Sequence, residues 1–182
     1  MIKVEAAALA TRARRITHVL TDCDGVLTDG TVYCSAAGEE LLRFSRRDGM
    51  GVQRLREAGI TCAIVTRERS PIVAARAEKL GLVVHAGIDD KRTWLVAWLV
   101  EQGLHAAQVA YIGDDVNDLE ITAAIAPHGL TGAPGDAEPE VTRVVHFVSG
   151  RCGGAGAFRE FADFILGARG SGISTEGSKP WA

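Results

Sequence analysis

Leu20-Thr-Asp-Cys-Asp-Gly-Val-Leu-Thr-Asp-Gly30 sets two aspartates two residues apart at the end of an apolar run and follows them with a glycine turn. The apolar run predicts a buried strand from His18 to Asp22, so Asp22 and Asp24 leave that strand together and enter a loop. Aspartate and glycine after a strand often form only a turn. The residues that other segments bring to this loop therefore decide between a turn and a site.

Apolar segments of strand length alternate with segments of helical period along the chain. Strands are expected at His18–Asp22, Thr31–Cys34, Glu40–Phe44, Thr61–Val65, Leu82–His85, Val109–Ile112, near His128–Leu130, and at Val144–Val148. Helices are expected at Asp48–Ala58, Pro71–Leu80, Lys91–Gln102 and Ala157–Leu166. Ser35–Gly38 predicts a β-hairpin between the second and third strands. This alternation predicts an α/β fold with a mainly parallel sheet flanked by helices, which binds ligands at the carboxyl ends of its strands.

The composition predicts one globular domain, residues 1–169, and a Gly/Ser-rich tail, 170–182, that is expected to be mobile. The 182 residues carry a net charge of −3, which gives no reason to expect binding to nucleic acid or to an anionic membrane. The basic patch Arg12, Arg14 and Arg15 is interpreted as the solvated face of an N-terminal segment.

The sequence predicts a cytoplasmic protein. It has no apolar run long enough to span a bilayer, and its N-terminus lacks the charge order of a secretory signal. The four cysteines show no Cys-x-x-Cys spacing. Cysteines used in this way are typical of a reducing compartment.

Three further polar clusters follow predicted strands, and each has an ordinary explanation when taken alone. Thr66 would be a helix N-cap and Lys91 a surface lysine. Asp114, Asp115 and Asp118 would form a turn and a helix cap. Together with the two aspartates of the first loop, however, they assemble carboxylates, a hydroxyl and a cation at one edge of the sheet, as a phosphate site requires.

Hydrolysis of a phosphate monoester depends mainly on positioning and charge neutralisation, because the ester is itself an anion. Asp22 is the expected nucleophile, which forms an aspartyl-phosphate. Asp24 is the expected acid, which protonates the leaving alkoxide and then deprotonates the attacking water. Thr66 is expected to donate to a phosphoryl oxygen, and Lys91 to add a fixed positive charge.

The same loops offer oxygen ligands for Mg²⁺. The expected ligands are Asp22, the backbone carbonyl of Asp24, and Asp114. The metal would orient the phosphoryl group and reduce its repulsion from the nucleophile. Asp118 is expected to orient the lysine or hold a metal-bound water. Asp115 is expected to support the metal site without binding the metal directly.

These residues resemble the haloacid dehalogenase (HAD) superfamily of magnesium-dependent phosphatases. An acid two residues after the nucleophile favours phosphate transfer over dehalogenation, because halide leaves without a proton. The likeness runs from Ile16 to about Gly167 and extends to phosphatases of 3-deoxy-2-ulosonic acid phosphates through Asp24-Gly-Val-Leu-Thr-Asp-Gly30, Gly38-Glu-Glu40, Arg47-Asp-Gly49, Tyr111-Ile-Gly-Asp-Asp115 and Gly153-Gly-Ala-Gly-Ala-Phe-Arg-Glu160. It implies a Rossmann-like HAD fold, Mg²⁺ as cofactor, and a phosphorylated sugar acid of lipopolysaccharide or sialic acid-like pathways as substrate.

Two branches of that group differ in the length of the sugar acid. The branch acting on 3-deoxy-D-manno-octulosonate 8-phosphate usually has Thr-Gly-Arg where this chain has Thr66-Arg67-Glu68. The nine-carbon branch tends to carry Glu at the third position and Arg and Lys along the next helix, which Glu68, Arg76 and Lys79 match here. We therefore expect the nine-carbon 9-phosphate to turn over faster than the eight-carbon 8-phosphate.

The resemblance also implies roles for residues that bind the substrate. Glu68 would accept from hydroxyl or amide donors of the sugar, and Arg76 would pair with the substrate carboxylate. Lys79, Arg47 and Asp48 are the other expected binding residues. The alternative for the arginine and lysine of the next helix is a solvated helix face.

The intervals between the motifs leave no room for a cap domain, because Asp24 to Thr66 holds a hairpin and a helix, and Thr66 to Lys91 a helix and a strand. Neighbouring subunits would then close the site. The resemblance implies a homotetramer with the hairpins Thr31–Phe44 packed at its centre, and a C-terminal segment that reaches a neighbour's site. The glycines of Gly153–Gly156 would otherwise be a linker.

Two other classes of protein compete with this interpretation. A receiver domain also uses Asp, Mg²⁺, Thr and Lys on a parallel sheet, but its phospho-acceptor follows a later strand and lacks the second aspartate. A non-catalytic family domain that assembles or regulates a sugar cytidylyltransferase would be expected to lose Asp22, Asp24, Lys91 or Asp114, and all four are present.

Overall fold

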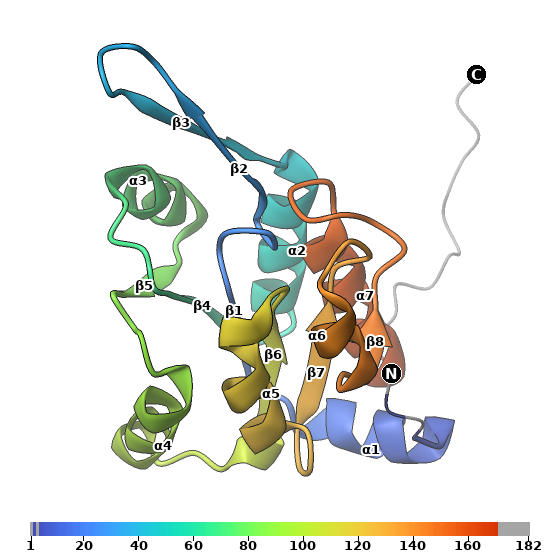
Figure 1. The fold of residues 1–182 in the computed structure, drawn as a ribbon. Helices are drawn as coiled ribbons and strands as arrows, with labels where there is room; N and C mark the ends of the chain where they lie inside the picture. Colours follow the sequence, from blue (N-terminus) through green and yellow to red (C-terminus); the bar gives the residue numbers. More distant parts are fainter. Residues whose placement is uncertain (1, 3, 171–182) are drawn as a thin grey trace, which may run out of the picture.

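The computed structural model describes residues 2 and 4–170, and it contains a six-stranded parallel sheet with helices on both faces (Figure 1). The strands lie in the order β5-β4-β1-β6-β7-β8. The strand bounds are β1 His18–Thr21, β2 Thr28–Cys34, β3 Glu40–Phe44, β4 Thr61–Thr66, β5 Val83–Ala86, β6 Val109–Ile112, β7 Leu130–Ala133 and β8 Phe147–Val148. The helix bounds are α1 Ala6–Arg15, α2 Arg46–Glu57, α3 Pro71–Leu80, α4 Lys91–Gln102, α5 Leu119–Ile125, α6 Pro139–Arg143 and α7 Ala157–Ala168.

The sheet is apolar on both faces, which is why helices cover both. Val19 of β1 packs into a buried cluster with residues of α1, α2, α3 and α7. The next residue, Leu20, points to the opposite face and packs with Leu95 and Trp98 of α4 and Ile121 of α5. Strands buried on both faces carry continuous apolar runs, and this explains the pattern in the sequence.

The register of the central strands brings their following loops together. Thr21 at the end of β1 aligns with Ile64 of β4 on one side and with Ile112 of β6 on the other. The chain crosses from β1 toward both edges of the sheet, and such a divergence opens a crevice at the carboxyl ends of the strands. The loops after β1, β4 and β6 therefore start side by side.

The antiparallel pair β2–β3 is separate from the main sheet and extends beyond it as a hairpin (Figure 1). Within residues 4–170, the segment between β1 and β4 holds this hairpin and α2, and the segment between β4 and α4 holds α3 and β5. Neither segment contains a further domain. No helix among the described residues has the length and apolar character needed to cross a membrane.

The parallel sheet, the hairpin and most of the expected elements are confirmed, with the largest errors near the C-terminal edge of the sheet. Helices α1, α5 and α6 were not predicted; α5 and α6 are short, with seven and five residues. Strand β7 begins at Leu130 instead of ending there, and β8 is confined to Phe147–Val148 because Pro139–Arg143 forms a helix just before it. The expected tail, 170–182, lies outside the described residues except for Gly170, so the domain boundary stays a prediction.

The interpretation of Arg12 as part of a solvated face is wrong. Its Nη1 donates to the carbonyl oxygens of Ala126 at 2.6 Å and Gly129 at 3.1 Å, and it lies 3.2 Å from His146 Nε2. These contacts tie α1 to the segments before and after β7. Arg14 and Arg15, in contrast, are exposed.

We expect Arg12→Ala to lower the free energy of unfolding by about 1–3 kcal/mol, because the substitution removes a charged donor from carbonyls that are partly buried. Urea denaturation measures the change. Arg14→Ala on the same helix is the matched control and should shift stability by less than about 0.5 kcal/mol. Equal losses in the two variants would mean that the contacts of Arg12 contribute nothing specific.

Candidate active site

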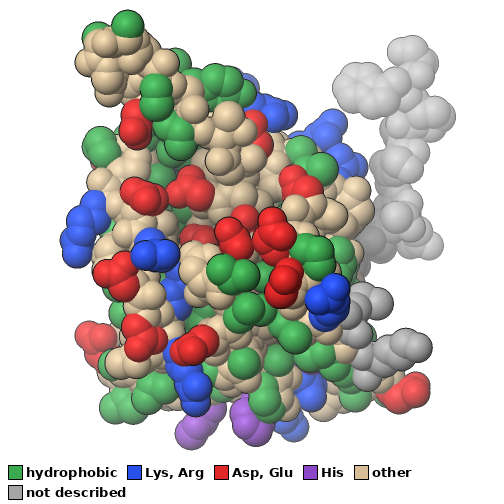
Figure 2. Space-filling model, in the orientation of Figure 1, with side chains coloured by type: hydrophobic (Ala, Val, Ile, Leu, Met, Phe, Trp, Pro, Cys, Tyr) green, Lys and Arg blue, Asp and Glu red, His purple; other side chains and the backbone are tan. Residues whose placement is uncertain are grey.

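The loops after β1, β4 and β6 line a cleft of about 470 Å³ at the carboxyl edge of the sheet. Its lining residues are Asp22, Asp24, Thr66, Arg67, Glu68, Asp89, Asp115, Val116 and Asn117. Figure 2 shows acidic side chains gathered across the middle of this face, with basic side chains spread among and around them. Residues that are far apart in sequence are thus brought together, as the topology predicts.

Asp22 lies on the floor of this cleft, directly after β1. Its Oδ1 accepts a hydrogen bond from the backbone N–H of Cys23 at 2.7 Å, and its Oδ2 pairs with Lys91 Nζ at 2.9 Å. Its side chain is only 7% exposed. One oxygen is held by the backbone and the other by a cation, so the orientation of the carboxylate is fixed.

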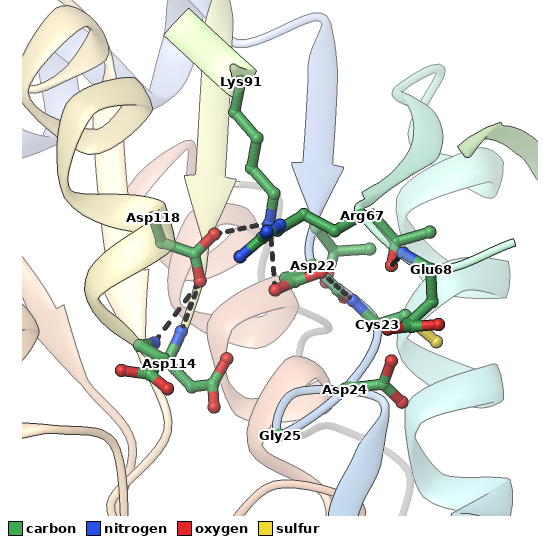
Figure 3. A network of polar contacts seen from close by, with 12 residues as sticks. Asp22, Cys23, Asp24, Gly25, Arg67, Glu68, Lys91, Asp114 and Asp118 are labelled. Carbon is green, nitrogen blue, oxygen red and sulfur yellow. Dashed lines mark hydrogen bonds and ion pairs between the residues drawn. The ribbon is translucent and has the colours of Figure 1, made fainter. Parts of the chain in front are cut away.

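Lys91 begins α4 and extends its side chain into the buried space beside β1 (Figure 3). Its Nζ also donates to Asp118 Oδ1 at 2.6 Å and to Tyr111 Oη at 3.2 Å. Burial alone would lower the pKa of Lys91, but the charges of Asp22 and Asp118 outweigh it and raise that pKa above the ordinary value. The residue is therefore a permanent buried cation.

Three carboxylates lie close enough together to hold a metal ion. Asp22, Asp114 and Asp118 each offer an oxygen, and these oxygens lie within 4.8 Å of one another. Burial, followed by repulsion from the other two carboxylates, raises the pKa of Asp114 to about 8. Burial and repulsion from Asp118 also raise the pKa of Asp22. A divalent cation would relieve this repulsion, and an all-oxygen donor set suits Mg²⁺.

Asp118 differs from the other two because the protein already occupies its oxygens. Its Oδ1 accepts from Lys91 Nζ and, at 2.5 Å, from Tyr111 Oη. Its Oδ2 accepts from the backbone N–H groups of Asp114 at 2.9 Å and Asp115 at 3.5 Å. A carboxylate oxygen accepts about two hydrogen bonds, so Asp118 is better suited to orienting the lysine and the loop that carries Asp114 than to binding the metal directly.

Asp24 is half-buried two residues beyond Asp22, in the position of an acid. Its Oδ1 accepts from Thr28 Oγ1 at 3.2 Å. Burial raises the pKa of Asp24, and the charge of Glu68 adds to that rise, while the Thr28 hydrogen bond opposes it. A carboxyl group with a raised pKa keeps its proton at a higher pH than an ordinary aspartate does, which suits proton donation to a leaving group.

Thr66 ends β4 and is 2% exposed. Its Oγ1 accepts from the backbone N–H of Glu68 at 3.1 Å, so its hydroxyl proton is left to donate to another acceptor. This hydrogen bond also turns the chain, so that the two exposed residues Arg67 and Glu68 line the cleft. Thr66 is thus a hydroxyl donor at the edge of the site.

The glycine motif that begins at Gly153 packs against the loop after β1 and is not a free linker. The backbone N–H of Gly154 donates to Val26 O at 3.0 Å. A Cβ atom at Gly153 would lie 1.9 Å from the carbonyl oxygen of Gly25. The motif therefore supports the backbone that carries Asp24.

Of the residues predicted to bind the substrate, Glu68 lines the cleft and the others lie elsewhere in the described chain. Asp48 is buried, and its Oδ1 accepts from the backbone N–H of Arg159 at 3.0 Å in the first turn of α7. Arg47 is exposed, near Gly156. Arg76 and Lys79 line a separate groove, where the guanidinium of Arg76 lies 5.7 Å from the centroid of the Phe44 ring. The substrate-binding roles of these four residues stay predictions.

Several residues of the site were not assigned a role from the sequence, among them Tyr111, Thr28 and Arg67. Tyr111 carried a usable signal, because a phenol inside a fully buried strand must find a hydrogen-bond partner. Thr28 and Arg67 carried no such signal, since threonine and arginine are common in exposed loops. Only the folded structure brings Arg67 to the cleft and Thr28 to Asp24.

No protein-family model matches the chain. The chain is 40% identical over 160 residues to 3-deoxy-D-manno-octulosonate 8-phosphate phosphatase KdsC of Haemophilus influenzae, covering 87% of each protein. A cobalt-bound structure of the deoxy-D-mannose-octulosonate 8-phosphate phosphatase from that organism is similar, with a TM-score of 0.83, 38% identity, and 91% and 96% of the two chains covered. The Moraxella catarrhalis 3-deoxy-D-manno-octulosonate 8-phosphate phosphatase, solved with magnesium, phosphate and 3-deoxy-D-manno-octulosonate (KDO), has a TM-score of 0.85 and 32% identity over 92% of this chain and 95% of its own.

We expect Gly25→Ala to weaken Mg²⁺ binding at least about tenfold, as substitutions of residues that contact a metal ligand commonly do. A Cβ atom at this position would lie 1.9 Å from Asp114 Oδ2, and the residue has a φ of +74°. Isothermal titration calorimetry with Mg²⁺ measures the affinity. The matched control is Gly38→Ala, which has a φ of +81° but no atom within 4 Å of the added Cβ. Equal Mg²⁺ affinity in the two variants would contradict the assignment of Asp114 as a ligand.

Proposed function

The chain belongs to the family of 3-deoxy-D-manno-octulosonate 8-phosphate phosphatases in the HAD superfamily, and from that membership we propose that it hydrolyses 3-deoxy-D-manno-octulosonate 8-phosphate to the free sugar acid and phosphate. It is a phosphoric monoester hydrolase of the HAD type, and its cofactor is Mg²⁺. The observation that supports the proposal most strongly is the buried ion pair between Asp22 and Lys91, which joins a nucleophile to a charge for the phosphoryl group.

The chemistry follows from the positions of these side chains. Asp22 attacks phosphorus and forms an aspartyl-phosphate, while Asp24 gives its proton to the leaving alkoxide. Asp24 then takes a proton from the water that cleaves the aspartyl-phosphate. Lys91 places a fixed positive charge beside the phosphoryl group, and the Thr66 hydroxyl donates to a phosphoryl oxygen, because both side chains are fixed before the substrate arrives.

Mg²⁺ would be held by Asp22, Asp114 and the backbone carbonyl of Asp24. When bound, it supplies Lewis-acid charge that lowers the repulsion between the phosphoryl group and the nucleophile. Asp118 Oδ1 accepts a hydrogen bond from Lys91 Nζ at 2.6 Å and keeps the lysine in place. Asp118 Oδ2 accepts from the backbone N–H of Asp114 and so fixes the loop that carries Asp114. Asp115 is exposed and caps the short helix that follows through its contact with Val116 N.

The length of the sugar acid is the open choice within this proposal. The relatives described above are named for the eight-carbon acid, and this favours 3-deoxy-D-manno-octulosonate 8-phosphate as the substrate. The nine-carbon 9-phosphate expected from the sequence remains the second candidate, because Glu68, one of the residues on which that expectation rests, lines the cleft. The specificity constants, kcat/KM, for the eight-carbon and nine-carbon phosphates decide between the two substrates. A higher constant for the nine-carbon compound would reverse the order proposed here.

We expect Asp22→Asn to reduce phosphate release at least about a thousandfold, because an amide cannot serve as the nucleophile. Phosphate release with Mg²⁺ and with a chelator measures activity, and the chelator should abolish it. Asp163→Asn, which removes a carboxylate of α7 that does not line the cleft, should retain activity. If Asp22→Asn keeps its turnover while its fold is intact, another residue is the nucleophile.

We also propose that the enzyme is a homotetramer that works in the cytoplasm, with the hairpins at the tetramer centre. The cleft is open to solvent in a single chain, so a neighbouring subunit would be needed to exclude water. The support is the apolar surface of the hairpin, where Val32, Tyr33 and Leu41 are 50%, 52% and 69% exposed. Tyr33 and Leu41 are paired across the two strands and form one apolar face.

We expect Leu41→Glu to convert the tetramer to smaller species and to reduce activity, because a charge would be buried at the subunit contact. Light scattering on a sizing column measures the mass. Val100→Glu, on the exposed face of α4, is the matched control and should stay tetrameric. A wild-type chain that is monomeric and fully active would contradict this part of the proposal.

A further inference from the structure

Arg67 has a distinctive position in the cleft. The cleft has four acidic side chains beyond the nucleophile, namely Asp24, Glu68, Asp89 and Asp115. Among the residues that the structure describes, Arg67 is the only basic side chain that lines the cleft with them. It follows Thr66 directly, and in the view of Figure 3 its side chain overlaps that of Lys91.

The geometry points to Arg67 as the residue that binds the carboxylate of the substrate, and so as a determinant of specificity. This inference rests on the proposed function, since it assumes a phosphate ester that also carries a carboxylate. Such a compound brings a second anion to a cleft walled by carboxylates, and repulsion would oppose its binding unless a cation met it. A guanidinium group presents parallel N–H donors that match both oxygens of a carboxylate.

Lys91 is not available for this second anion. Its ammonium group contacts Asp22, Asp118 and Tyr111 and carries only three protons. What remains of its charge lies next to the nucleophile, where the phosphoryl group must bind. The two anionic ends of the substrate thus require two separate cations, and Arg67 is the second one.

Arg67 is free to exchange its present partner for the substrate. Its Nε lies 3.4 Å from Asp89 Oδ1, and the two side chains are 57% and 86% exposed. An ion pair this exposed contributes little stability and is readily broken. Asp89 therefore holds the guanidinium near the cleft without competing strongly against a bidentate carboxylate.

Within a single chain, the neighbouring arginines do not line this cleft. Arg69 lies over Gly87, where an added Cβ atom would come within 2.3 Å of its guanidinium carbon, and it does not line the cleft. Arg76 lies in the separate groove beside Phe44, with its Nη2 at 3.5 Å from Ser45 O. Among the arginines of the described chain, Arg67 alone lines the cleft, next to Thr66, whose hydroxyl is expected to donate to a phosphoryl oxygen.

The test compares 3-deoxy-D-manno-octulosonate 8-phosphate with its carboxyl methyl ester, which keeps the phosphate and the sugar but removes the negative charge of the carboxylate. We expect Arg67→Gln to raise KM for the acid about tenfold or more with little change in kcat, because a charge-assisted pair made equally in ground and transition states is lost. KM for the methyl ester should change less than about twofold. Arg67→Lys keeps the positive charge but lacks the two parallel N–H donors, so it should raise KM for the acid by less than Arg67→Gln does.

Arg92→Gln is the matched control, since Arg92 is an exposed arginine at the start of α4 that does not line the cleft. It should leave both KM values unchanged. The inference is overturned if Arg67→Gln weakens both compounds equally, which would indicate a contact with the phosphate. It is also overturned if neither compound is affected, or if Arg92→Gln reproduces the loss for the acid.

The same experiment separates this inference from the proposed function. Turnover of the acid by the wild-type enzyme tests the function directly, before any variant is compared. Both compounds are also measured as competitive inhibitors of p-nitrophenyl phosphate hydrolysis, which reports binding even where neither is a substrate. If Arg67→Gln raises the inhibition constant of the acid but not that of the methyl ester, the role of Arg67 is supported in either case. If Arg67→Gln and the wild-type enzyme give equal inhibition constants for the acid, the inference is overturned.

Discussion

The buried ammonium group of Lys91 is the interaction on which the site depends. Burying a carboxylate is costly unless a cation and hydrogen bonds compensate it, and two carboxylates, Asp22 and Asp118, are buried side by side here. Lys91 contacts both, and Tyr111 completes the set by donating to Asp118. Burial and the charge of Asp118 raise the pKa of Asp22 to about 7, and Lys91 opposes that rise, so the cation favours the ionised form of the proposed nucleophile.

The sheet and its tight loops make this arrangement possible. The strand register starts the loops after β1, β4 and β6 side by side, and glycines allow them to approach closely. Gly25 leaves room for Asp114, and Gly153 leaves room for the backbone of Gly25. These close contacts fix the loops, so Asp24 and Asp114, the proposed acid and the proposed metal ligand, are positioned by residues from three distant parts of the chain.

Much of the fold, and the clustering of the residues proposed to react, could be predicted from sequence, because both follow from simple periodic rules. Continuous apolar runs identify parallel strands, and polar residues directly after such runs must meet at one edge of the sheet. Asp22, Lys91 and Asp114 were found in this way. Side chains of irregular segments follow no such rule, and Arg67 and Arg12 therefore needed the folded structure: one reaches the cleft from a turn, and the other caps carbonyls from a helix that was not expected.

The central claim is that the carboxylate held by Lys91 becomes phosphorylated during turnover. Acid quenching of the enzyme with Mg²⁺ and substrate, followed by borohydride reduction and tandem mass spectrometry, identifies the modified residue. An Asp24→Asn variant should trap more of the phosphoenzyme, because it lacks the base for the second step. The account predicts modification at Asp22 alone. A phosphoryl group on another residue, or turnover in which no residue is ever modified, would contradict it.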